Sequence, residues 1–138
     1  MKFNPLPEIV GGRRLVVVDD SIVRGNTTRQ IVQMLRDAGA LEVHMRISAP
    51  PIKHPCPYGI DMSTREEMVA HERTVDEVAE HLGTDSLAYL SLEGVYEAVN
   101  GSRGRHCDAC FTGEYPLEGS AAEKDKFAFE RELPRVRA

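Results

Sequence analysis

The 138-residue sequence lacks several features that would assign it to a specialised class of protein. It has no apolar run of about 18 residues, the length that a membrane-spanning helix needs, and no secretory signal pattern. Its formal net charge is −5, whereas a surface that binds nucleic acid is basic. No internal repeat is present. We therefore expect a cytoplasmic protein that binds neither membranes nor nucleic acids.

Cysteine is also scarce, with only Cys56, Cys107 and Cys110. In an intracellular protein, a Cys-x-x-Cys pair is more typical of metal or redox chemistry than of a structural disulfide. A closed zinc or iron–sulfur site normally needs four ligands, and the cysteines supply only three. His54 and His106 flank them and could complete a zinc site. Three unrelated cysteines with one chance pair are the alternative.

The most informative stretch is residues 14–28, RLVVVDDSIVRGNTT. Its valine-rich run is typical of a buried parallel strand, and Asp19 and Asp20 follow at the strand's carboxyl end, where ligands bind in open α/β sheets. Gly25 then permits a tight loop before a helix, whose N-terminus favours phosphate. Ionised carboxylates suit ribose hydroxyls or hydrated Mg²⁺ instead. The stretch therefore predicts a site for a phosphorylated sugar; an ordinary turn and helix cap without a ligand is the alternative.

Hydrophobic periodicity predicts a strand–helix–strand unit of the length of one right-handed crossover. The strands are expected at 14–18 and 41–47 and the helix at about 27–38, with Thr27 and Thr28 as capping residues. Because the second strand alternates polar and apolar residues, we place it near a sheet edge and the first strand in the interior.

The remainder of the chain is expected to be less regular. Residues 1–12 contain two prolines and predict an irregular lead-in, and the prolines at 50–57 predict an extended loop. Capping-box patterns at 63–66 and 74–77 predict two short helices. Residues 121–138 form a charged tail.

These residues resemble a known family. Residues 16–25 are similar to the phosphoribosyl-pyrophosphate (PRPP) motif of type I phosphoribosyltransferases. More narrowly, the ordered motifs resemble those of the glutamine PRPP amidotransferases, at VVVDDSIVRG (16–25), SAPPIKHPC (48–56), YGID (58–61), DSLAYLSLEG (85–94) and CDACFTG (107–113). The resemblance implies an α/β fold: the C-terminal half of a type I phosphoribosyltransferase parallel sheet, followed by a helical, cysteine-containing C-terminal region. Residues 1–100 would form the partial phosphoribosyltransferase domain, and residues 101–138 the cysteine-pair segment and tail.

The resemblance also implies an activity. Enzymes of this family transfer glutamine-derived ammonia to PRPP and form 5-phosphoribosylamine, glutamate and pyrophosphate, the first step of de novo purine synthesis. They are several times longer than this chain and assemble as homotetramers. We therefore expect the chain to be a C-terminal portion without the glutaminase domain and the pyrophosphate loop, and to be inactive alone.

The resemblance assigns roles to individual residues, none of them a catalytic acid or base. Asp19 and Asp20 would meet the ribose hydroxyls and Mg²⁺. The backbone around the 5′-phosphate would be that of Ser21, Ile22, Val23, Arg24, Gly25, Asn26, Thr27 and Thr28. Asn26 departs from the family, in which threonine is usual, so an altered phosphate contact is expected there.

One branch of the family carries a structural [4Fe–4S] cluster on four cysteines. Cys56, Cys107 and Cys110 match three of these ligand positions, and the fourth ligand is expected upstream of this chain. Two alternatives to an enzyme portion stay open at this point: a non-catalytic PRPP- or nucleotide-binding fragment, and an iron–sulfur or zinc module.

Overall fold

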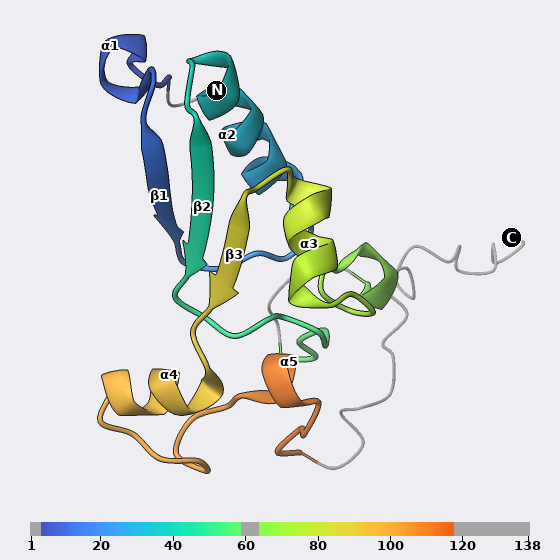
Figure 1. Ribbon diagram of the computed structural model, residues 1–138. Helices are drawn as coiled ribbons and strands as arrows, with labels where there is room; N and C mark the ends of the chain where they lie inside the picture. The colour runs from blue at the N-terminus through green and yellow to red at the C-terminus, as the bar shows by residue number, and fades with distance from the viewer. Residues whose placement is uncertain (1–3, 59–63, 118–138) are drawn as a thin grey trace, which may run out of the picture.

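The computed structural model describes residues 4–58 and 64–117. Its centre is a parallel sheet in the strand order β1-β2-β3. Helices α2 and α3 lie together against one face of this sheet (Figure 1). The bounds are β1 (Arg14–Asp19), α2 (Asn26–Asp37), β2 (Glu42–Ile47), α3 (Val75–Leu82) and β3 (Ser86–Tyr89). The predicted α/β class and the first crossover are therefore confirmed.

The hydrophobic core lies between the sheet and these two helices. Val43 and Met45 on β2 are fully buried, and Val17 of β1 and Leu87 of β3 flank Met45 in register. Val78 from α3 is only 1% exposed and belongs to the same core. Alternate residues of each strand share a face, so one apolar row across the sheet packs against the helix layer.

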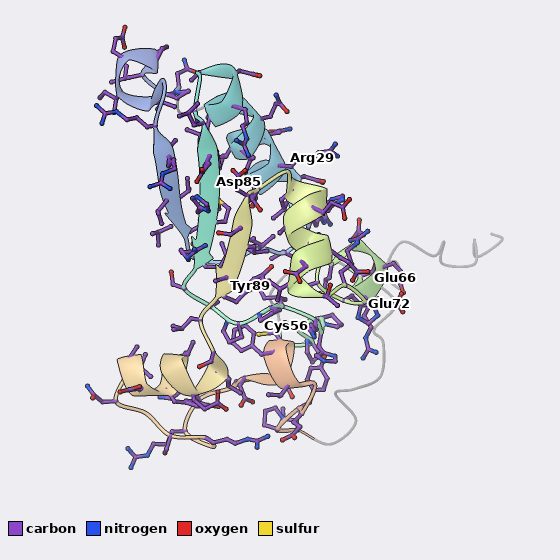
Figure 2. The ribbon with its side chains drawn as sticks, in the orientation of Figure 1. Arg29, Cys56, Glu66, Glu72, Asp85 and Tyr89 are labelled. Carbon is purple, nitrogen blue, oxygen red and sulfur yellow. The ribbon has the colours of Figure 1, made fainter. Side chains whose placement is uncertain are left out.

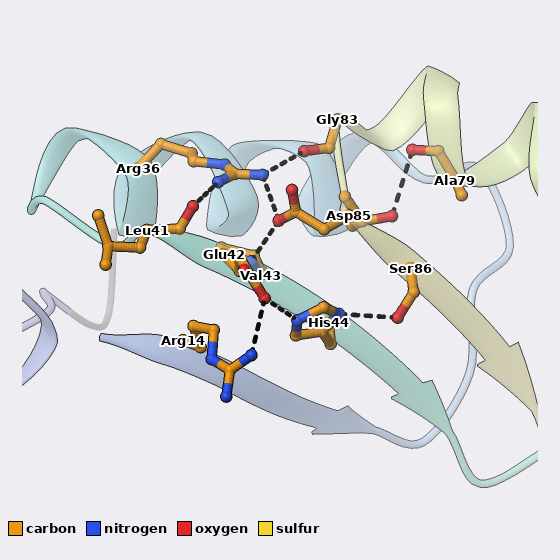
Figure 3. Close-up of polar contacts among 11 residues, drawn as sticks. Arg14, Arg36, Leu41, Glu42, Val43, His44, Ala79, Gly83, Asp85 and Ser86 are labelled. Atoms are coloured by element: carbon orange, nitrogen blue, oxygen red, sulfur yellow. Dashed lines mark hydrogen bonds and ion pairs between the residues drawn. The ribbon is translucent and has the colours of Figure 1, made fainter. Parts of the chain in front are cut away.

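The predicted positions of the first two strands in the sheet are wrong. β2 is the central strand and β1 lies at the edge of the described sheet. Val16 and Val18 on the outer face of β1 are 65% and 71% exposed, because α2 and α3 cover only the opposite face. On the polar face of β2, the partly buried His44 finds hydrogen-bond partners: it bonds Ser86 at 2.9 Å and Glu42 at 2.8 Å (Figure 3).

The helix boundaries agree with the sequence in part. Thr74 and Glu77 form the predicted capping box of α3, and Gly83 ends that helix. The other capping box is one residue later than predicted: Thr64 and Glu67 form it, around the short 3-10 helix η1 (Arg65–Glu67). Position 63 of the predicted box lies outside the described residues.

Three shorter helices complete the described fold, namely α1 (Pro7–Val10), α4 (Leu92–Ala98) and α5 (Ala109–Thr112). The first lies where an irregular lead-in was predicted; proline is tolerated at a first helical position because its missing N–H would be unpaired there anyway. In the described parts of the chain, no helix is long and apolar enough to span a membrane. Residues 59–61 of the YGID motif and the tail at 121–138 lie outside these parts.

Candidate functional site

The two predicted carboxylates lie at the carboxyl end of β1. Asp19 is half-buried, and one of its carboxylate oxygens accepts the Asp20 backbone N–H at 2.9 Å. Asp20 is exposed and accepts the Ser21 hydroxyl at 2.8 Å. Within the described residues, neither carboxylate forms an ion pair with a basic side chain. Two adjacent anionic groups are thus placed at the edge where open α/β sheets bind ligands.

Ser48, at the carboxyl end of β2, holds this edge together and was missed by the sequence reasoning. Its backbone N–H and its hydroxyl both donate to the Asp19 carbonyl, at 3.0 and 2.9 Å. The signal was available, since the carboxyl ends of neighbouring parallel strands meet at one edge of the sheet. The contact fixes the point where β1 turns into the loop.

The loop that follows is anchored in the core. Ile22 is only 2% exposed, so its side chain serves packing, and only its backbone is available to a ligand. Gly25 adopts a left-handed conformation with φ 79°. A Cβ at this position would lie 3.0 Å from Cδ2 of Leu82 on α3. The loop therefore requires glycine both for its backbone angle and for its close approach to the neighbouring helix.

The N-terminus of α2 is open to an anion. Gly25 is its N-cap and supplies no side-chain acceptor, and no acidic residue occupies the first turn. The prediction that Thr27 and Thr28 cap the helix is wrong, because both lie within its first turn; Thr27 is exposed and Thr28 is 4% exposed. A helix of this length carries partial positive charge at its start, where its first N–H groups lack intrahelical partners. Asn26, the first helical residue, is exposed at the same end.

The Arg24 side chain reaches away from its own loop to η1. Its guanidinium lies 3.2 Å from the carboxylate of Glu67. The Val69 backbone N–H donates to the Val23 carbonyl at 2.9 Å beside this pair. Nothing in the local sequence around Glu67 points to this partner 43 positions away.

The fold brings the segments of Cys56 and Cys110 together. The backbone N–H groups of Lys53 and His54 both donate to the Cys110 carbonyl, at 3.0 and 3.1 Å. The Tyr115 hydroxyl donates to the carbonyl of Pro55 at 2.6 Å. Figure 2 shows Cys56 near the end of β3, close to Tyr89 in that view. The loop that carries Cys56 is therefore bonded to the segment that carries the cysteine pair.

The three cysteines are free thiols in this arrangement. Burial, and then the nearby Cys107 and Cys56, raise the pKa of the Cys110 thiol, so Cys107 and Cys56 each lie within electrostatic reach of Cys110. Burial, followed by the charge of Arg65, lowers the pKa of His54. In the described residues, no group of three or more histidine, cysteine or acidic side chains is arranged to hold a metal ion. The thiols match an iron–sulfur cluster in donor type, and the described residues do not form a complete site.

Comparison with known proteins identifies the family, although no protein-family model matches the chain. The chain is 59% identical over 119 residues to the amidophosphoribosyltransferase of Archaeoglobus fulgidus. It is 55% identical over 117 residues to that of Synechococcus elongatus and 52% identical over 122 residues to that of Bacillus subtilis. The chain belongs to the amidophosphoribosyltransferase family. These alignments cover 85–86% of the chain and 24–26% of the relatives, so the chain spans about a quarter of their length.

Solved structures of the family share the fold described above. The chain matches a structure of the allosteric regulatory enzyme of purine biosynthesis with a TM-score of 0.75 and 52% identity. It matches the glutamine PRPP amidotransferase of Bacillus subtilis, complexed with ADP and GMP, with a TM-score of 0.73 and 50% identity. Each match covers 83% of this chain and 26% of the solved chain. The parallel sheet with its helices is therefore part of the fold of these enzymes.

Proposed function

We propose that this chain is the PRPP-binding portion of an amidophosphoribosyltransferase. The complete enzyme would transfer glutamine-derived ammonia to PRPP and release 5-phosphoribosylamine, glutamate and pyrophosphate. The observation that carries the proposal is that Asp19 and Asp20 and a helix N-terminus without a side-chain cap lie at the two ends of one short loop. A phosphorylated sugar needs both features, since its hydroxyls are hydrogen-bond donors and its phosphate is an anion.

In this proposal the two ends of the loop bind different parts of PRPP. The carboxylates of Asp19 and Asp20 accept hydrogen bonds from the ribose hydroxyls. The loop backbone and the first turn of α2, residues 21–28, hold the 5′-phosphate, with the hydroxyl of exposed Thr27 as a further donor. The Bacillus subtilis structure in the comparison holds ADP and GMP, and both are ribose phosphates of the kind proposed here.

The proposed displacement of pyrophosphate depends on positioning and charge neutralisation more than on proton transfer. Displacement of pyrophosphate from C1 of the ribose passes through a transition state with oxocarbenium character, and fixed dipoles and carboxylates stabilise such charge. Mg²⁺ would neutralise the pyrophosphate. It usually binds through one or two carboxylates together with water and substrate phosphates, and the adjacent Asp19 and Asp20 fit that requirement. No side chain of the loop is assigned as an acid or base.

A [4Fe–4S] cluster is a second part of the proposal. Cys56, Cys107 and Cys110 would supply three thiolates, with the fourth ligand from a part of the enzyme outside this chain. The hydrogen bonds from Lys53 and His54 to the Cys110 carbonyl support it, because they place the two cysteine-bearing segments side by side. The cluster would cross-link these segments and would take no part in the transfer of ammonia to PRPP.

The partners proposed are a glutaminase domain that delivers ammonia and other copies of the enzyme in a homotetramer. The exposed Val16 and Val18 support a larger assembly, because parallel sheets are normally covered on both faces. The chain spans about a quarter of the length of its relatives, which favours a second candidate for the chain on its own: a PRPP-binding module without catalysis. A cytoplasmic location suits the free cysteines, which persist reduced there.

Calorimetric titration of Mg-PRPP into the anaerobically purified chain tests the binding site. We expect saturable binding, and we expect the double variant Asp19→Asn with Asp20→Asn to abolish it. Asp37→Asn is the matched control, because Asp37 is an exposed carboxylate at the far end of α2. Equal affinity in the parent and the double variant would contradict the proposal. No binding by the parent would contradict a self-sufficient site in this chain.

An iron and sulfide assay on the same preparation tests the cluster separately. The iron content of the parent chain is expected to fall in Cys56→Ser. Iron at the same level in parent and variant would contradict ligation by Cys56. Zinc in place of iron would favour the alternative of a zinc module.

A further inference from the structure

The loop between β1 and α2 is braced by residues 67–69, a segment that the proposed chemistry does not use. Two successive loop residues bond to it, and the next residue lies close to it. The Val23 carbonyl accepts the Val69 N–H at 2.9 Å, and the Arg24 guanidinium lies 3.2 Å from Glu67. A Cβ at Gly25 would lie 3.5 Å from the Val69 side chain. The segment is therefore in a position to control the backbone of the loop.

Glu67 is the charged group in this brace, and its own helical turn holds it in place. The same carboxylate oxygen that meets Arg24 accepts the Thr64 backbone N–H at 3.2 Å within the capping box of η1. The side chains of Arg24 and Glu67 are each 47% exposed. A carboxylate fixed from one side by its capping box can orient a guanidinium on the other side.

We propose that Glu67 is a positioning residue for the phosphate of PRPP. It acts through Arg24: the ion pair holds the backbone of residues 22–26 in the conformation that the ligand meets, and Glu67 itself touches no ligand. The inference rests on the proposed PRPP-binding function of the same loop. It extends the proposed site by one residue, Glu67, from a segment about 40 positions further along the chain.

The variant Glu67→Gln tests the inference in the full chain without any ligand. Glutamine also serves in a capping box, so the substitution removes the charge that meets Arg24 and retains the cap of η1. Glu66→Gln is the matched control, since Glu66 carries the same charge one residue earlier and makes no ion pair with Arg24. We expect amide hydrogen exchange at residues 22–26 to become about twofold to fivefold faster in Glu67→Gln only, the range that a partly exposed ion pair provides. Equal exchange in the two variants would overturn the inference.

Calorimetry with Mg-PRPP provides the second readout. The dissociation constant is expected to rise by up to about fivefold in Glu67→Gln and to stay unchanged in Glu66→Gln. If the parent chain does not bind Mg-PRPP, a self-sufficient site in this chain is contradicted, and hydrogen exchange alone then tests whether Glu67 holds the loop.

A charge swap separates positioning from direct contact. The double variant Arg24→Glu with Glu67→Arg restores an ion pair of reversed polarity. Recovery of both exchange protection and affinity would support the positioning role. Recovery of protection without affinity would mean that the charge at position 24 acts on the phosphate directly, by contact or through space, and would overturn the indirect role assigned to the pair.

Discussion

Arg36 and Asp85 form an ion pair of 2.5 Å that joins the last turn of α2 to the start of β3. The same Asp85 oxygen accepts the Val43 backbone N–H of β2 at 2.6 Å, and Arg36 also donates to the Leu41 carbonyl at 2.8 Å (Figure 3). The hydrogen bond from Val43, and then that from Arg36, hold the pKa of Asp85 below its ordinary value. One carboxylate thus ties together three elements of the crossover unit that positions the candidate site.

The variant Asp85→Asn is expected to lower the free energy of unfolding by about 1 kcal/mol at neutral pH, because it weakens charge-assisted bonds that are partly exposed to solvent. A lowered pKa stabilises the fold above the ordinary value of 3.8, and this contribution is lost as the pH falls through the lower folded-state value. The difference between parent and variant should therefore shrink as the pH falls below 3.8. Urea unfolding across this range measures it, with Asp37→Asn as the control. A difference independent of pH would contradict this role of the charge.

Removal of the Tyr89 hydroxyl is not expected to lower the free energy of unfolding, in contrast to Asp85→Asn. Its hydroxyl is buried without a hydrogen-bond partner among the described residues, and burial raises its pKa to about 12. Tyr89→Phe keeps the ring and removes the unpaired hydroxyl, so the free energy of unfolding should stay equal or rise by up to about 1 kcal/mol. Tyr96→Phe is the control and should lower it, since the Tyr96 hydroxyl donates to Asp108 at 2.5 Å.

The alkaline behaviour of Tyr89 provides a second measurement. Because the pKa is raised by burial, the unfolded chain ionises at Tyr89 before the folded chain does, so this group leaves the stability unchanged below pH 10.0 and lowers it as the pH rises toward about 12. Tyr89→Phe should therefore lose less stability than the parent over this interval in urea unfolding. A marked destabilisation by Tyr89→Phe near neutral pH would mean that the hydroxyl has a partner.

Gly25 and Gly83 provide a matched comparison that tests the geometry of the loop. Both are left-handed, with φ 79° and 77°, but a Cβ at Gly83 would meet nothing within 4 Å, whereas at Gly25 it would lie 3.0 Å from Leu82. Each alanine variant should lose about 1–2 kcal/mol of stability from the backbone angle alone. Gly25→Ala should lose more and should also weaken Mg-PRPP binding, as measured by urea unfolding and calorimetry. Equal losses, with unchanged binding, would contradict the close approach of the loop to α3.

Thiol reactivity should rank the cysteines. Cys107 is exposed, whereas Cys110 is half-buried and has a raised pKa because of its burial and the adjacent thiols. Because the thiolate is the reacting form, Cys110 should be alkylated last near neutral pH, and its rate should rise most steeply as the pH increases. Timed iodoacetamide labelling with peptide mass spectrometry measures the order, and Cys107 serves as the internal reference. Faster labelling of Cys110 than of Cys107 would contradict the burial of the Cys110 side chain.

Local sequence was sufficient for much of the site. The valine run with Asp19 and Asp20 predicted a strand that ends in carboxylates, and the helix after Gly25 begins within a residue of its predicted start. The capping box of Thr74 and Glu77 is also as predicted. These features depend on backbone propensities and on contacts between residues a few positions apart, and such contacts can be predicted from short stretches of sequence.

The tertiary structure decided the rest. The sheet order could not be read from strand composition: β1 is apolar on both faces yet lies at the described edge, and the polar face of β2 is central because His44 finds partners on its own strand and on β3. The pairs Arg24–Glu67 and Arg36–Asp85 join residues more than 40 positions apart. Sequence by itself determined the strand–loop–helix that carries the candidate site. Only the packing of distant segments determined which side chains brace that loop, because such contacts depend on where the whole chain folds back on itself.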